Sequence, residues 1–192
     1  MKKSPKKTAK KTRAPQKSGR ERTREHAAHS EAARFTAAYL AGMVDSTLDV
    51  TIGPARGAGD GEFTFENDPS WREIRKLILC LYAGHAAESR FDGGKGKARA
   101  ITAGDNAKAL KRLRTLVHSA EPLAKLEKTL RDEAKALVEE HLDAITALAN
   151  ALLERETLSN GEAARVVAIA EGARARRDLP RYQPSRMQLA GK

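Results

Sequence analysis

The residues with the clearest chemical potential lie in one short segment, from His26 to Arg34. Glu31 occupies the acidic position of an H-E-x-x-H pattern, in which two imidazoles on one helical face hold Zn²⁺ and the glutamate polarises the attacking water. Ser30 and Arg34 stand where that pattern requires histidine, and a guanidinium cannot deprotonate to become a ligand. The segment therefore predicts a helix that carries the general-base position of a zinc peptidase without two of its ligands.

A second arrangement in the same segment uses His26 and His29. A spacing of three residues places both imidazoles on one face of a helix, where they could bind a metal ion together with a further ligand. The alternative is that both histidines face solvent near the start of the helix. The sequence leaves these two interpretations open.

The elements that must position these residues are mainly helical. Only 4% of the residues are aromatic, and Ala and Leu dominate the apolar 40%, which favours helices over sheets. Apolar periodicity and capping signals, among them a capping box of Ser70 and Glu73, predict helices over residues 18–41, 70–90, 105–117, 122–152 and 161–177. The range 122–152 is long for one globular helix, so we expect a break near Arg131 or His141.

Two short runs rich in β-branched and aromatic residues, 50–52 and 62–65, flank the glycine-rich stretch 53–61. This pattern predicts a small β-hairpin with a loose loop. The predicted fold class is therefore mainly α, a compact helical domain with one small hairpin.

The net charge of +11 is concentrated at the two ends of the chain. Residues 1–20 carry nine basic residues and no acid, and this composition predicts a disordered basic tail. We expect the folded domain to span residues 21–177 and an irregular basic tail to span 178–192. The first tail could neutralise nucleic-acid phosphates or only keep the protein soluble. The candidate nucleic-acid-binding residues are Lys2, Lys3, Lys6, Lys7, Lys10, Lys11 and Arg13.

Cys80 is the only cysteine, and it lies in the apolar run 77–81. A single cysteine excludes a disulfide framework and indicates a reducing, cytoplasmic location. Its apolar neighbours favour core packing over a role as nucleophile. The chain contains no run of about 18 apolar residues, so we expect no membrane span.

Four blocks of the sequence, in order, resemble the peptidase domain of the FtsH family of ATP-dependent zinc metalloproteases. The family's zinc-binding helix and the V-T-I-x-P segment after it match Ser30–Phe35 and Val50–Pro54. An L-x-G-G-x-A-A-E helix matches Leu81–Glu88, and the closing helical signature matches Ile145–Leu158. The match of Ala103–Asp105 to the segment that carries the third zinc ligand is looser.

This resemblance implies a stand-alone, FtsH-peptidase-like helical domain in which Asp105 holds the third-ligand position. It also implies that Glu31 is a general base in an inactive site without zinc. We expect Arg34 to replace the charge of the metal by pairing with Glu31 and Asp105. The alternative is an active zinc peptidase whose ligands lie elsewhere. Because family members assemble as hexameric rings, the resemblance also implies self-association or docking onto a protein partner.

Overall fold

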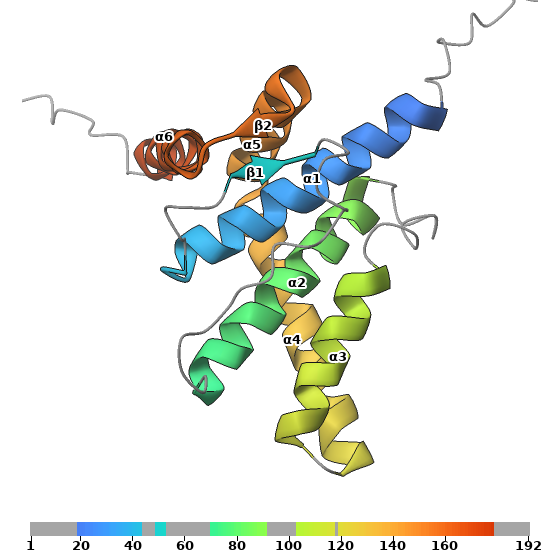
Figure 1. Ribbon diagram of the computed structural model, residues 1–192. Coiled ribbons are helices and arrows are strands. Elements are labelled where there is room, and N and C mark those ends of the chain that lie inside the picture. The colour runs from blue at the N-terminus through green and yellow to red at the C-terminus, as the bar shows by residue number, and fades with distance from the viewer. Residues whose placement is uncertain (1–18, 44–48, 53–69, 92–102, 118, 179–192) are drawn as a thin grey trace, which may run out of the picture.

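The computed structural model describes residues 19–43, 49–52, 70–91, 103–117 and 119–178 of the 192-residue chain (Figure 1). These residues form helices α1 (Gly19–Leu40), α2 (Trp71–Phe91), α3 (Ala103–Leu116), α4 (Ala120–Glu140), α5 (Leu142–Arg155) and α6 (Asn160–Asp178), and strands β1 (Val50–Thr51) and β2 (Thr157–Leu158). The predicted mainly helical fold is confirmed. Within the described ranges, every helix is too short or too polar to cross a membrane.

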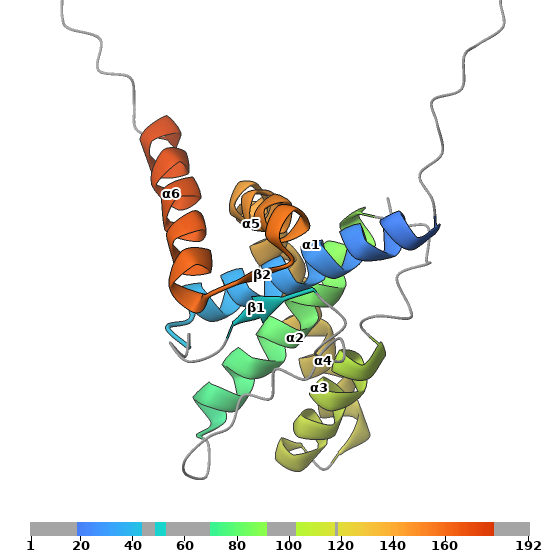
Figure 2. The same cartoon turned by 45° about the horizontal axis from the view of Figure 1, so that its top comes forward.

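The helices enclose two apolar clusters that meet at α2. The first cluster lies between α1, α2, α5 and α6, and the short sheet closes one side of it. Figure 2 shows α5 beside α1, and α6 beside α5. The second cluster joins the N-terminal half of α2 to α3 and α4 through Leu77, Ile78, Leu81, Leu113 and Leu130. Since α2 belongs to both clusters, its two faces are both largely buried.

Small residues line the contact between α1 and α2. Ala28, Ala32 and Ala33 of α1 are fully buried, and Ala83 of α2 is fully buried as well. Gly84 follows Ala83 on the same helix. Without large side chains between them, two helices can bring their backbones close together. The position of α1, and of every polar side chain that it carries, is therefore set by this close contact.

The long helix predicted over residues 122–152 is interrupted at His141, which separates α4 from α5. One of the two expected break points is thus confirmed, while Arg131 lies inside the continuous α4. The two parts differ in the clusters that they serve, since α4 contributes to both and α5 only to the first. Leu130 of α4 packs in the second cluster, whereas Ile145 and Leu148 of α5 pack in the first.

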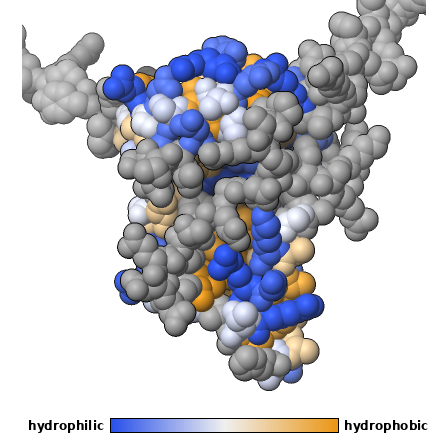
Figure 3. Space-filling view, in the orientation of Figure 1, coloured by the Kyte–Doolittle hydropathy of each residue, from blue (hydrophilic) through white to orange (hydrophobic). Residues whose placement is uncertain are grey.

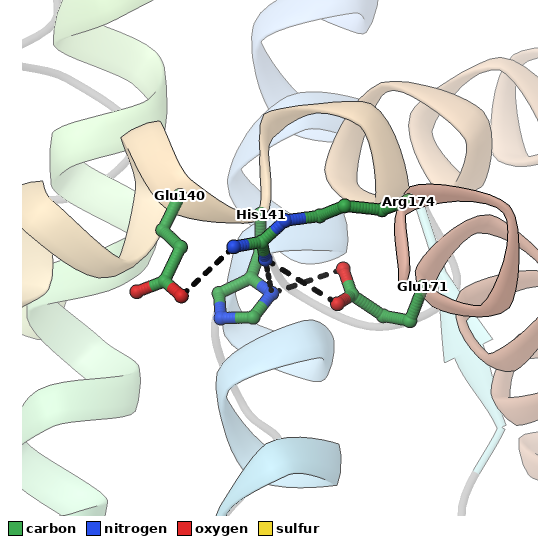
Figure 4. Close-up of polar contacts among 4 residues, drawn as sticks. All are labelled: Glu140, His141, Glu171 and Arg174. Carbon is green, nitrogen blue, oxygen red and sulfur yellow. Dashed lines mark hydrogen bonds and ion pairs between the residues drawn. The ribbon is translucent and has the colours of Figure 1, made fainter. Parts of the chain in front are cut away.

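Figure 4 shows a group of four polar residues that fastens α6 to this break. The His141 Nδ1 lies 2.9 Å from Oε1 of Glu171 and 3.1 Å from Nη1 of Arg174. The same Arg174 donates a hydrogen bond of 2.9 Å through Nη2 to Oε1 of Glu140. Hydrogen bonds from this arginine lower the pKa of Glu140. These contacts hold the C-terminal half of α6 against the α4–α5 junction.

The sheet pairs segments from distant parts of the sequence. β1 is antiparallel to β2, with Val50 opposite Leu158 and Thr51 opposite Thr157. The expected hairpin partner, residues 62–65, lies outside the described residues. The prediction missed the strand at 157–158, because two residues directly after a helix carry too weak a period-2 signal. Glu156, with a φ of 63°, makes the turn that leads from α5 into this strand.

Two capping boxes define helix starts. Ser70 and Glu73 exchange hydrogen bonds at the start of α2, as the sequence predicted. Ser159 and Glu162 repeat this arrangement at the start of α6. Hydrogen bonds from Arg155 and from Ser159 lower the pKa of Glu162 to about 2. Glu162 therefore stays charged and stabilises α6 at all but very acidic pH.

Two isoleucines offer a matched test of the first cluster. Ile145 is fully buried in α5, and Ile169 in α6 is 63% exposed. We expect Ile145→Ala to lower the free energy of unfolding by about 2–5 kcal/mol, because it removes buried apolar contacts and leaves a cavity. Ile169→Ala should change it by less than about 0.5 kcal/mol. Urea denaturation followed by circular dichroism measures both values, and similar losses in the two variants would contradict the assigned core.

Candidate functional site

Ser30 and Arg34, which stand where an H-E-x-x-H pattern would have histidine, both face α2 and are buried. They meet this helix at Gly84. A Cβ atom at Gly84 would lie 2.9 Å from the Arg34 Cγ and Cδ atoms and 2.9 Å from the Ser30 Oγ. The alkyl stem of Arg34 therefore occupies the space above this glycine.

The Arg34 guanidinium forms an ion pair within α1. Its Nη1 donates a hydrogen bond of 2.9 Å to Oε1 of Glu31, one turn earlier. The side chain of Arg34 is 8% exposed and that of Glu31 is 21% exposed, so water screens the pair only partly. The expected pairing of these two residues is confirmed. Asp105 belongs to α3, but its side chain lies outside the described part of the structure, so the second expected contact of Arg34 stays a prediction.

The hydroxyl of Ser30 is the other polar group in this contact. It is buried, and it has no hydrogen-bond partner among the described residues. A buried hydroxyl without a partner costs about 1–3 kcal/mol, so this position is not optimised for stability. Gly84 permits the hydroxyl to remain there, because any larger residue would meet it.

His26 is buried and His29 is only partly exposed, so the interpretation that both histidines face solvent was wrong. His26 is 7% exposed, and its Nδ1 lies 3.9 Å from Oε1 of the buried Glu88 on α2. The imidazole of His29 stacks on the ring of Phe91 at 4.4 Å, and its Nδ1 donates to the carbonyl oxygen of Glu25. The two histidines share a face because of their spacing, and the close contact of α1 with α2 buries His26 and partly covers His29.

The residues at the predicted metal position do not fit zinc. Within the part of the chain that the structure describes, no group of three or more His, Cys, Asp or Glu side chains is arranged to hold a metal ion. Arg34 places a permanent positive charge at one ligand position, and the hydroxyl of Ser30 is a poor substitute for an imidazole. His141 and His85 lie apart from this position, at the α4–α5 break and beside α4.

Cys80 lies one turn before Gly84 on α2 and is 1% exposed. Burial raises the pKa of its thiol to about 12, although the nearby positive charge of Arg34 acts in the opposite direction. A nucleophilic cysteine needs an accessible thiolate. The predicted structural role of Cys80 therefore fits its surroundings.

The sequence did not reveal a groove of about 610 Å³ between α2 and α4. Its floor includes Tyr82, and the guanidinium of Arg131 lies 4.2 Å above the centre of that ring. Arg131 also donates two hydrogen bonds to Glu127. Burial, and secondarily this arginine, lowers the pKa of His85 on the groove wall, which keeps its imidazole neutral at pH 7. Ser30, Glu31 and Arg34 of the predicted peptidase site do not line the groove.

The basic residues predicted to bind nucleic acid, from Lys2 to Arg13, lie outside the described residues. Comparison of the chain with protein-family models and with curated proteins finds no match. The likeness to the FtsH peptidase domain therefore depends on the sequence blocks and on the chemistry of α1.

A glycine pair tests the contact between Arg34 and α2. Gly84→Ala places a methyl group against the stem of Arg34, and we expect it to destabilise the fold by about 1–3 kcal/mol through overpacking. Gly172 in α6 has open space at its Cβ position. Gly172→Ala should therefore be neutral or stabilise by up to about 1 kcal/mol through helix propensity. Urea denaturation compares the variants, and equal stabilisation by both alanines would contradict the close contact.

The Cys80 thiol should not react in the folded protein. We expect a maleimide or a disulfide reagent at pH 8 to leave the native chain unlabelled, because the thiol is buried and its pKa is about 12. In denaturant the same reagent should label one thiol per chain. Mass spectrometry measures the labelling, and rapid modification of the native protein would contradict the burial of Cys80.

Proposed function

We propose that this chain contains a domain of the FtsH peptidase type that has lost its reaction and acts by binding protein. The observation that carries the proposal is the ion pair between Arg34 and Glu31 at 2.9 Å. It involves two of the three positions that a zinc-binding helix uses for catalysis, the general base and the second histidine.

The chemistry of this pair supports loss of activity. A general base must reach the proton of a metal-bound water, and its pKa must suit that transfer. Glu31 instead accepts a charge-assisted hydrogen bond from a permanent cation within its own helix. Arg34 thus compensates the negative charge of Glu31, so this glutamate requires no Zn²⁺ beside it.

The packing around the pair supports retention of the architecture for a purpose other than catalysis. Ser30 and Arg34 contact Gly84, which belongs to the second resembling block, Leu81–Glu88. Val50 and Leu158, from two further blocks, are paired in the sheet. Blocks that are distant in sequence thus meet around one region. A binding role, through self-association or through a protein partner, requires this architecture but not the reaction.

One second function has an observation in its favour. Residues 1–20 carry nine cations and no anion. A chain of this composition binds polyanions in a sequence-tolerant and salt-sensitive way. Association with nucleic acid through this segment is therefore our second proposal, and it is compatible with the first.

Restoring the two histidines tests the main proposal. We expect the wild-type protein to purify without stoichiometric zinc and to leave casein intact. The variant Ser30→His/Arg34→His should bind roughly one zinc per chain, because two imidazoles at a spacing of four residues would then join Asp105. Elemental analysis by mass spectrometry measures the metal content, and circular dichroism checks that the fold persists.

The matched control adds Asp105→Asn to the double-histidine variant, and it should bind zinc at least ~10-fold more weakly, since an amide is a poorer ligand. Failure of the double variant to bind zinc would contradict the assigned motif. Stoichiometric zinc in the wild-type protein, with casein cleavage that a chelator abolishes, would instead support an active peptidase with other ligands.

A further inference from the structure

Helix α3 is the most basic helix of the described body. Its fourteen residues include Lys108, Lys111, Arg112 and Arg114 against a single acid, Asp105. The longer α4 carries more acidic than basic residues. The positive charge of α3 is therefore not compensated within the helix.

Three of these cations share the solvent face of α3. Lys108, Lys111 and Arg114 are exposed, while Ala109 and Leu113 are fully buried on the opposite side. A spacing of three residues advances about 4.5 Å along a helix, so the three charges span about 9 Å along the axis. Figure 3 shows hydrophilic side chains along the region of α3 in the lower part of the molecule. The exposed face of α3 is thus a short basic strip.

Two cations of this strip, Lys111 and Arg114, differ in their pairing from the arginines of neighbouring helices. Arg75 and Arg90 of α2 form ion pairs with Glu133 and Glu139 of α4. Among the described residues, Lys111 and Arg114 have no ion-pair partner. An anion that binds to these two residues therefore displaces no internal carboxylate, and it gains the full benefit of releasing its own counterions.

We propose that the exposed face of α3 binds the phosphate backbone of nucleic acid. Duplex DNA carries about one phosphate per 1.7 Å of axis, so a strip of about 9 Å meets more negative charges than it has cations. A lipid surface fits less well, because an interfacial helix must insert an apolar face. The apolar face of α3 is already packed, with Leu113 in the second cluster. The exposed large apolar residues of the described chain lie on other helices, at Leu40, Trp71, Phe91 and Ile169.

The test uses the full chain and a short mixed-sequence duplex DNA, with affinity measured by fluorescence anisotropy between about 50 and 200 mM salt. We expect Lys108→Gln/Lys111→Gln/Arg114→Gln to make the slope of log K against log salt concentration less negative by about 2–3, since each lost phosphate contact contributes about 0.9. Glutamine keeps a helix propensity close to those of lysine and arginine. Circular dichroism checks the fold, and the pair Lys111→Gln/Arg114→Gln, with an expected change of about 1–2, replaces the triple variant if helicity falls.

The matched control is Arg72→Gln/Lys135→Gln/Arg165→Gln, which removes the same charge from exposed sites on α2, α4 and α6. All variants retain residues 1–20, so the contribution of that segment cancels in the comparison. The control should change the slope by less than about 1. Equal changes in both triple variants, or no change in the α3 variant, would overturn the proposal. It would also be overturned if the α3 variant lost affinity for phosphatidylserine vesicles but not for DNA.

Discussion

The close contact between α1 and α2 is the constraint on which the rest of the structure depends. It is possible because small residues face one another, with Ala32 and Ala33 on one helix and Ala83 and Gly84 on the other. Once α1 is held this near to α2, its remaining faces are available to α5 and to the short sheet. The same contact places Arg34 over Gly84. The side chain of Arg34 fits there because glycine has no Cβ atom to occupy that space.

The ion pair within α1 explains why a buried guanidinium is tolerated at this contact. Removing a charge from water is costly unless a partner and hydrogen bonds compensate it. Glu31 supplies the compensating charge from one turn away, and it keeps partial access to solvent. The pair thus places a positive charge beside a carboxylate, as a metal ion next to a glutamate would. The difference is that a guanidinium holds no water to activate.

Much of the secondary structure was predictable from local signals. The helix predicted over 70–90 spans residues 71–91, and the exchange between Ser70 and Glu73 that starts it is the predicted one. The break at His141 was one of two expected positions. The pairing of Arg34 with Glu31 was also predictable, because residues three apart on a helix are neighbours. Each of these features is decided within one or two helical turns.

The features that could not be predicted all join residues far apart in the chain. Helical periodicity shows that His26 and His29 share a face, and it does not say whether that face meets water or another helix. Likewise, nothing local to Val50 indicates that its partner is Leu158 rather than a nearby segment. The sequence by itself determined the helices, the uneven charge and the presence of Ser30 and Arg34 at the two positions where an H-E-x-x-H pattern has histidine. Only the tertiary structure decided which residues lie against Ser30 and Arg34, because packing between helices depends on the shape and volume of both surfaces together.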